Sequence, residues 1–254
     1  MPADADAAPA PAPPAPAPAP APAVTKAEWL VAQRELLEQA LTGAGPGRTS
    51  ASALLEGLLL LNMGYDIVFG LGWAAPLASA CKGDLASHTD ALRREIAAAP
   101  APADGGEVSV EDLVAAQLAQ HGSADGVRRA GSDNLVNHVL WISRILGFVS
   151  RFLQLVAREG EQKETYQAAR LAYAEFLQPF HPTVLQWMVP PLLGLVPYKA
   201  SMLALMGVPS DRAAATDADA RRLALEAMQP LHERLHKFLG ERSLLFTDKA
   251  GQAF

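Results

Sequence analysis

Two histidines near the end of the chain have the spacing of a zinc site. Residues 232–236 (HERLH) match H-E-x-x-H, which on a helix places two imidazoles on one face beside a carboxylate that can act as a base. A catalytic zinc also needs a third protein ligand, and only a short segment follows Lys237. Because Leu235 belongs to an apolar face with His232 and His236 at its edge, we interpret both histidines as surface or boundary residues. We therefore predict no metal and no other cofactor.

A second polar group lies at i, i+3 and i+7 on a predicted helix, where Cys81, Asp84 and His88 share one face. A thiol, an imidazole and a carboxylate can form a nucleophilic catalytic site. Such sites normally gather their residues from separate elements around an oxyanion hole, and the sequence shows no motif that would supply one. We therefore interpret this stripe as one wall of a polar pocket and predict that the protein is not an enzyme.

A third stripe contains Asn137, Trp141 and Arg144, again at i, i+4 and i+7. A tryptophan flanked by hydrogen-bonding side chains offers an aromatic plate to a sugar or another amphipathic headgroup. The alternative is a buried tryptophan beside a solvated arginine. Separately, Phe180 and His181 lie between two prolines at a helix–helix corner, where His181 either supports the turn or points a ring nitrogen into a cavity.

Composition limits the class of protein. Of 254 residues, 50% are apolar and 19% are charged, and the net charge is -6. This balance argues against nucleic-acid binding, which requires clustered lysine and arginine, but it permits docking on a membrane surface. The single cysteine, Cys81, allows no disulfide framework and fits a reducing compartment. We expect no signal peptide, and the nearest candidate for a membrane span, residues 183–198, is short and contains three prolines. The predicted location is cytoplasmic and peripheral at membranes.

Three segments differ in composition. Residues 1–24 alternate proline and alanine and are expected to form an extended, disordered tail, which serves as a spacer or, alternatively, as a polyproline ligand. Residues 25–245 are expected to form one domain, and residues 246–254 a C-terminal tail. No internal repeat is evident.

Apolar periodicity in the domain predicts an all-α fold of about eight helices, without the alternation typical of strands. We expect caps at Ser50 or Ser52, at Ser109, and at Ser132 or Asp133. The expected helices cover approximately residues 29–41, 54–69, 76–99, a short helix after 109, 132–158 ending at Gly160, 162–178, 183–195 and 217–239. Several of them are apolar on more than one face. This surplus indicates either a thick three-layer core or helices that enclose something else, such as acyl chains.

Four motifs in this order resemble the glycolipid transfer protein family: Lys82-Gly-Asp84-Leu-Ala-Ser-His88, Leu140-Trp141-Ile-Ser-Arg144, Phe180-His181 and Val196-Pro197-Tyr198-Lys199. The resemblance extends from about Leu54 to Leu239. It implies a two-layer helical sandwich that holds one sphingolipid, with the headgroup in a surface pocket and the chains between the layers.

The resemblance also implies residue roles. Asp84 matches the aspartate that accepts a hydrogen bond from the ceramide amide, and His181 matches the histidine that donates to the ceramide carbonyl. Trp141 matches the tryptophan on which the first sugar stacks. In the ceramide-1-phosphate branch, the positions of Asn137 and Trp141 are arginines that bind phosphate.

Two positions depart from both branches. His88 stands where glycolipid carriers have asparagine and phosphate carriers have lysine or arginine, and Ala91 stands where glycolipid carriers have a sugar-binding lysine. Asn137 and Trp141 argue against phosphate because the arginine fork is missing, although Arg144 and a protonated His88 would partly replace it. A glycosylated ceramide is therefore the favoured ligand, with ceramide-1-phosphate as the alternative.

The predicted function is non-enzymatic transfer of a sphingolipid between membranes. A lipid sensor that relays lipid status to a partner and a zinc hydrolase built on His232 and His236 are the competing hypotheses. For transient membrane docking we expect Trp187, with Tyr198 and Lys199 beside it, to lie at the lipid headgroup level. The alternative is that Trp187 packs in the core.

Overall fold

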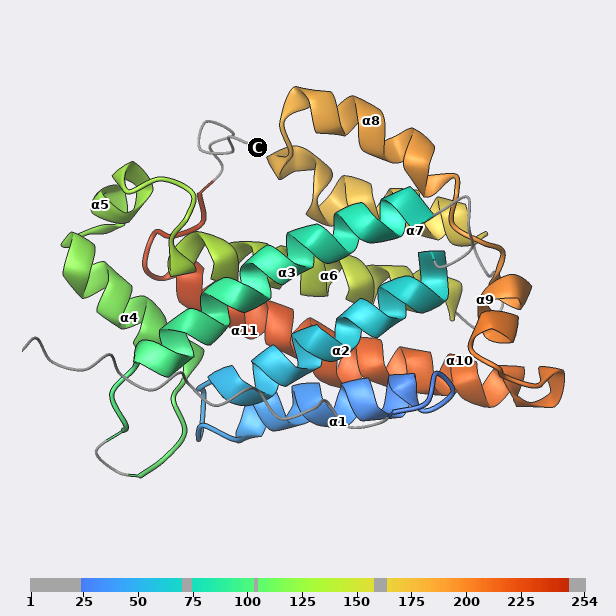
Figure 1. Ribbon diagram of the computed structural model, residues 1–254, viewed down its shortest axis with the longest axis horizontal. Coiled ribbons are helices and arrows are strands. Elements are labelled where there is room, and N and C mark those ends of the chain that lie inside the picture. Colours follow the sequence, from blue (N-terminus) through green and yellow to red (C-terminus); the bar gives the residue numbers. More distant parts are fainter. Residues whose placement is uncertain (1–23, 70–74, 103–104, 158–163, 247–254) are drawn as a thin grey trace, which may run out of the picture.

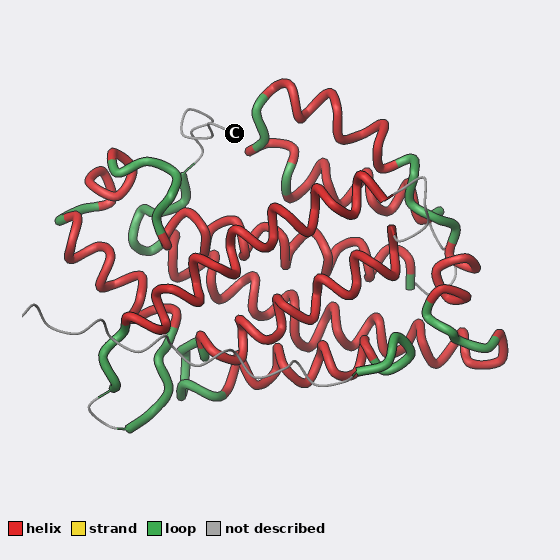
Figure 2. Tube along the Cα trace, in the orientation of Figure 1, coloured by secondary structure: helices red, strands yellow, loops and turns green. Residues whose placement is uncertain are grey.

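The computed structural model describes residues 24–69, 75–102, 105–157 and 164–246, and in this part of the chain it contains helices and no β-strand (Figures 1 and 2). Residues 1–23 of the predicted tail 1–24 and residues 247–254 of the predicted tail 246–254 lie outside the described residues. The helices are α1 (Trp29–Thr42), α2 (Ala51–Phe69), α3 (Ala75–Ala98), α4 (Val110–His121), α5 (Ala124–Arg129), α6 (Leu135–Val156), α7 (Thr165–Phe176), η1 (Gln178–Phe180), α8 (Thr183–Leu193), α9 (Lys199–Leu205), η2 (Ser210–Arg212), α10 (Ala213–Arg222), η3 (Leu223–Met228) and α11 (Gln229–Gly240).

The helices form a two-layer sandwich, which confirms the predicted fold class. One layer contains α1, α2 and α3, and the other contains α6, α7 and the C-terminal rod from α10 to α11 (Figure 1). Contacts of α3 with α6 and of α1 with η3 join the layers. Helix α8 covers one edge next to α7, and α9 closes one end of the sandwich against α2.

Helix α6 is the centre of the fold. By length and composition it could cross a membrane, but 83% of its most apolar window is buried inside the protein. The expectation that residues 183–198 are the nearest candidate for a membrane span was therefore wrong, because α6 is longer. The helix is apolar nearly all round because it packs against α3 on one side and against α7, η3 and α11 on the other.

Hydroxyl and amide side chains begin the helices. Ser50 accepts a hydrogen bond from the Ala53 amide, and Ser109 accepts one from the Asp112 amide, as the sequence predicted. The predicted cap of α6 was wrong: it is Asn134, whose side chain accepts from the Asn137 amide, rather than Ser132 or Asp133. All three residue types cap well, so the course of the loop decides between them.

The predicted helix over residues 217–239 is a longer rod that begins at Ala213 and widens into a π-helix over η3. Only Gln229 separates Pro230 from this widened segment. A proline ring collides with the carbonyl four residues earlier in a regular α-helix, so a wider turn accommodates it. The widened turn also brings the Ala224 carbonyl to the Ser150 hydroxyl of α6, at 2.9 Å.

Two short helices, α5 and α9, were not predicted. They have 6 and 7 residues, too few for a helical apolar period to be recognised. The predicted end of α6 near Gly160 lies outside the described residues.

Two serine caps, one buried and one at an exposed helix, allow a matched test of how much a buried cap contributes to stability. Ser109 is buried, receives a second hydrogen bond from Arg48, and forms an isolated bridge with Ser50. Ser123 caps the short, exposed α5. We expect Ser109→Ala to lower the free energy of unfolding by about 2 kcal/mol and Ser123→Ala by about 0.5 kcal/mol, measured by urea denaturation. Equal losses of unfolding free energy would contradict the expectation that the buried cap, Ser109, contributes more than the exposed one.

Candidate functional site

Asp84 and His88 lie one turn apart on α3 and face α6. The Asp84 carboxylate is 62% exposed, whereas the His88 side chain is only 7% exposed. His88 Nε2 lies 3.7 Å from Asp84 Oδ1, beyond hydrogen-bond distance, and has no hydrogen-bond partner among the described residues. His88 Nδ1 lies 2.9 Å from Nδ1 of His138 on α6. The stripe predicted on α3 is therefore joined to α6 through a histidine pair.

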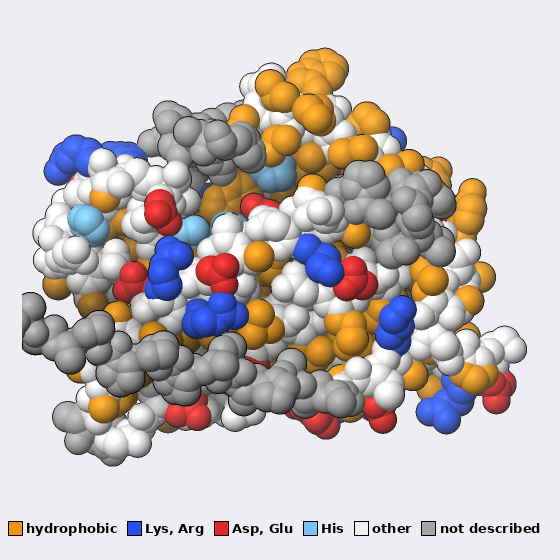
Figure 3. Space-filling model, viewed as in Figure 1, with side chains coloured by type: hydrophobic (Ala, Val, Ile, Leu, Met, Phe, Trp, Pro, Cys, Tyr) orange, Lys and Arg blue, Asp and Glu red, His pale blue; other side chains and the backbone are white. Residues whose placement is uncertain are grey.

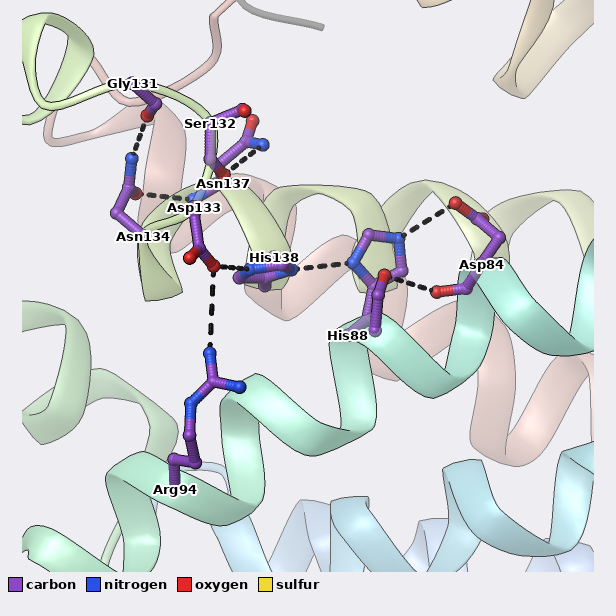
Figure 4. A network of polar contacts seen from close by, with 10 residues as sticks. Asp84, His88, Arg94, Gly131, Ser132, Asp133, Asn134, Asn137 and His138 are labelled. Carbon is purple, nitrogen blue, oxygen red and sulfur yellow. Dashed lines mark hydrogen bonds and ion pairs between the residues drawn. The ribbon is translucent and has the colours of Figure 1, made fainter. Parts of the chain in front are cut away.

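Sequence reasoning missed His138 and the residues behind it. His138 Nε2 lies 3.3 Å from Asp133 Oδ1, and Arg94 of α3 lies 3.7 Å from the same oxygen (Figure 4). Burial, followed by the neighbouring His88, lowers the pKa of His138, although the contact with Asp133 opposes this shift. The contacts thus run from the exposed Asp84 carboxylate through the buried rings of His88 and His138 to Asp133 and Arg94.

His181 lies at the corner between η1 and α8, held in extended backbone before Pro182. Its Nδ1 lies 2.9 Å from the Tyr173 hydroxyl, and its ring stacks on Trp141 with centroids 5.4 Å apart. Burial lowers the pKa of His181, the Asp84 carboxylate raises it, and Arg144 lowers it further. The electrostatic influence of Asp84 indicates that the two residues, predicted as separate motifs, lie on the same side of the protein.

Trp141 and Arg144 both face this site from α6. Only 6% of Trp141 is exposed, because His181 stacks on its ring and the Arg144 guanidinium lies 4.8 Å from its centroid. Arg144 also lies 3.6 Å from the Phe180 ring and donates a hydrogen bond to the Phe246 carbonyl at 2.7 Å. Burial lowers the pKa of Arg144 to about 10. Both side chains are thus already engaged by protein groups.

Asn137 has a local role in this structure. Its side chain donates to the Ser132 carbonyl at 3.0 Å, and its amide donates to the Asn134 side chain (Figure 4). It therefore fixes the loop that carries Asp133. Ala91, at the other departure from the family pattern, is buried.

An apolar cavity lies between the layers, further along α6. Its empty space, with the open solvent at its mouth included, is about 860 Å³, and the surface exposed inside it is apolar. Its walls come from α1, α2, α6, α7, α9 and α10. The α6 residues on its wall, Phe148, Val149, Phe152, Leu153 and Val156, follow Arg144 along the same helix. The polar site and the apolar cavity thus share one helix as a common wall.

Helix α8 carries an apolar patch that faces solvent. Trp187 is 78% exposed, and Val184 and Met188 are exposed on the same helix. Hydrophobic side chains gather over α8 at the top of the molecule (Figure 3). The alternative that Trp187 packs in the core is therefore wrong. Below α8 the surface is hollowed, with hydrophobic and histidine side chains at its floor (Figure 3). Tyr198 is exposed at the start of α9, whereas Lys199 is partly buried and pairs with Asp217, so Lys199 does not present a free charge for docking.

The remaining polar motifs have other partners. Burial, with help from Asp84, raises the pKa of the Cys81 thiol to about 12, so the thiol stays protonated at neutral pH. His232 Nδ1 lies 2.8 Å from the Ser143 carbonyl, and the exposed His236 lies beside it. Within the described ranges, no group of three histidine, cysteine or acidic side chains is placed to hold a metal.

Comparison with known families accounts for this arrangement. The model for the glycolipid transfer protein family matches residues 70–208, a stretch longer than half of the chain. The chain belongs to the glycolipid transfer protein family. Proteins of this fold bind and transfer glycolipids or ceramide-1-phosphate and are lipid carriers rather than enzymes. No curated protein sequence matches the chain significantly.

Solved structures of glycolipid transfer proteins share the fold. Mouse ceramide-1-phosphate transfer protein is 19% identical with a TM-score of 0.65, over 85% of this chain and 98% of the mouse chain. Fungal HET-C2, a glycolipid transfer protein, is 20% identical with a TM-score of 0.60, over 78% and 89%. A mutant of Arabidopsis accelerated-cell-death 11, complexed with C12 ceramide-1-phosphate, is 17% identical with a TM-score of 0.61, over 89% and 99%. At sequence identities of 17–20%, the similarity to these structures establishes the fold alone.

Three buried or partly buried histidines make stability depend on pH. Burial lowers the pKa of His138, His181 and His232 below 6.5, so the folded state resists their protonation. Below pH 6.5 the unfolded chain binds more protons than the folded one, and the free energy of unfolding therefore falls as the pH falls. We expect the urea midpoint to decrease from pH 7.5 to pH 5.5, and His232→Gln to weaken this dependence. A midpoint that is constant or rises on acidification would contradict this expectation.

Proposed function

We propose that this member of the glycolipid transfer protein family binds one ceramide-based lipid and carries it between membranes without catalysing a reaction. The observation that carries the proposal is that an exposed carboxylate, Asp84, acts electrostatically on a partly buried imidazole, His181, in a fold whose helix α6 also lines an apolar cavity. A ceramide presents an amide donor, a carbonyl acceptor and hydrocarbon chains. This site offers a partner for each of them.

The two polar groups have complementary roles. Asp84 accepts a hydrogen bond from the ceramide amide, because a carboxylate has acceptors only. The Tyr173 hydroxyl lies closer to His181 Nδ1, at 2.9 Å, than to the Leu185 carbonyl, at 3.3 Å. When this hydroxyl donates to Nδ1, the neutral ring keeps its proton on Nε2 and donates it to the ceramide carbonyl. The chains would occupy the cavity between the layers.

The contacts that Arg144 already makes with protein groups favour a glycosylated ceramide over ceramide-1-phosphate. Binding phosphate through this guanidinium would require it to leave the Phe246 carbonyl and the Phe180 ring. A sugar has no such requirement. For the sugar to stack on Trp141, His181 would shift from the ring that it now covers. The most direct experiment is mass spectrometry of lipids that co-purify with the protein, and a predominance of ceramide-1-phosphate would overturn the headgroup assignment.

We expect Asp84→Val to abolish transfer of glucosylceramide between vesicles with little change in melting temperature. The carboxylate is mostly exposed, so its loss removes no core contact, whereas the lost charge-assisted hydrogen bond to the lipid costs about 1.5–3 kcal/mol. Asp90→Val is a matched control, because Asp90 is a similarly exposed aspartate on the same helix that pairs with Arg93. Transfer by Asp84→Val at the rate of the unmodified protein would refute the assignment of the site.

We also propose that the α8 patch docks the protein transiently on the membrane from the cytoplasmic side. Exposed Trp187, Val184 and Met188 form an apolar edge next to His181, where the lipid would enter and leave. Tryptophan is well suited to the interface between lipid headgroups and hydrocarbon.

We expect Trp187→Ala to slow transfer and to remove most of the blue shift of tryptophan fluorescence on addition of neutral phosphatidylcholine vesicles. Because Trp187 is exposed, the melting temperature should hardly change. Leu225→Ala is the control, since Leu225 is an exposed apolar residue on η3, away from α8. If both variants transfer lipid equally well, the docking surface lies elsewhere.

A further inference from the structure

The contact between His88 and His138 constrains the protons on both rings. Two Nδ1 atoms 2.9 Å apart form a hydrogen bond only when one carries a proton and the other does not. The far side of His138 decides which ring donates. Its Nε2 faces the Asp133 carboxylate at 3.3 Å, and a carboxylate can only accept, so this nitrogen carries the proton of the neutral ring.

The position of the proton on His138 then determines its position on His88. With its proton on Nε2, neutral His138 has a free lone pair on Nδ1 and accepts from His88. His88 therefore carries its proton on Nδ1, and its Nε2 is a bare acceptor. This nitrogen is buried, has no hydrogen-bond partner among the described residues, and faces the Asp84 carboxylate at 3.7 Å (Figure 4).

Two acceptors thus lie side by side at the proposed lipid site. Neither acceptor can donate a hydrogen bond to the other, and a buried polar atom without a hydrogen-bond partner lowers the stability of the folded protein. A ligand that brings two donors to this spot would satisfy both. The ceramide amide serves Asp84 in the proposed function, so the partner of His88 Nε2 is a hydroxyl. A phosphate would instead bring negative charge and acceptor oxygens toward a carboxylate and a lone pair.

We propose that His138, anchored by Asp133, is a positioning residue that keeps the pocket-facing Nε2 of His88 unprotonated, so that the site selects an uncharged, hydroxyl-bearing headgroup over a phosphate. This inference rests on the proposed function, since it concerns the headgroup of the same lipid. It gives His88, which departs from both branches of the family pattern, a definite role as a hydrogen-bond acceptor.

Acid should weaken this selection. A proton taken up by the histidine pair removes its bare acceptor and gives the pair a positive charge, which favours phosphate. The lowered pKa of His138 agrees with a neutral pair at pH 7.5. The charged or titratable groups around the pair are Asp84 and Arg94 from α3 and Asp133 from the loop before α6. Beyond Asp84, His181 from the η1–α8 corner and Arg144 from α6 influence each other electrostatically.

The first experiment reads the tautomer directly. Long-range ¹H–¹⁵N NMR of the lipid-free full chain at pH 7.5, with His88 assigned by His88→Gln, should show His88 protonated on Nδ1 and His138 protonated on Nε2. Asp133→Ala should relax this preference without unfolding the protein, because the Asp133 side chain is exposed. A His88 proton on Nε2 in the unmodified protein would overturn the inference. This measurement contains no lipid, so its outcome is independent of the transfer function.

The second experiment measures selectivity as the ratio of glucosylceramide transfer to ceramide-1-phosphate transfer between vesicles. We expect His138→Phe to lower this ratio about tenfold at pH 7.5, the equivalent of one hydrogen bond of about 1.4 kcal/mol. His138→Gln, whose amide oxygen can accept from His88 Nδ1, should restore much of it, and His121→Phe on α4 is the matched control. In the unmodified protein the ratio should fall from pH 7.5 to pH 5.5, and in His138→Phe this pH profile should change.

The outcomes separate the two proposals. Loss of transfer of both lipids by the unmodified protein would refute the proposed carrier function and leave the tautomer result intact. An unchanged ratio in His138→Phe, with transfer preserved, would refute the positioning role alone. If His138→Phe does not fold, the ratio in Asp133→Ala decides, with a fall of about threefold expected and no change overturning the inference.

Discussion

The burial of α6 on nearly every face is the constraint on which the rest of the structure depends. A helix of this length with so little polar surface must be surrounded, and one layer of neighbours leaves half of it exposed. The two layers solve this problem by placing α3 on one side and α7, η3 and α11 on the other. The apolar cavity lies along the C-terminal half of this buried helix.

The few polar side chains on α6 gain importance from this burial, because each must find a partner inside the protein. Ser143 meets His232, and Ser150 meets the Ala224 carbonyl in the widened turn of η3. His138 meets His88. Each pair ties α6 to a different neighbouring helix. The resemblance of His232 and His236 to a zinc motif has an ordinary explanation in this setting, since His232 holds α11 against α6.

The sequence predicted the long helices well because each has enough turns for an apolar period to show, as in α2 and α6. It failed for α5 and α9, and it placed the cap of α6 one or two residues too early. Asp84 and His181 could be assigned roles from the family resemblance, but their proximity depends on how the η1–α8 corner packs over α6. His138 escaped notice for the same reason: its partners, His88 and Asp133, come from another helix and from a loop, and no spacing along one helix relates them.

The hydrogen bond from Arg144 to Phe246 ends on a main-chain carbonyl. Any residue type at position 246 supplies the same acceptor, so substitution there preserves the contact. Insertion or deletion of one residue between Gly240 and Phe246 would instead displace the carbonyl and release a buried guanidinium next to Trp141. Variation in the length of this segment among related proteins would therefore alter the charge presented at the headgroup site, even where every residue that touches the lipid stays the same.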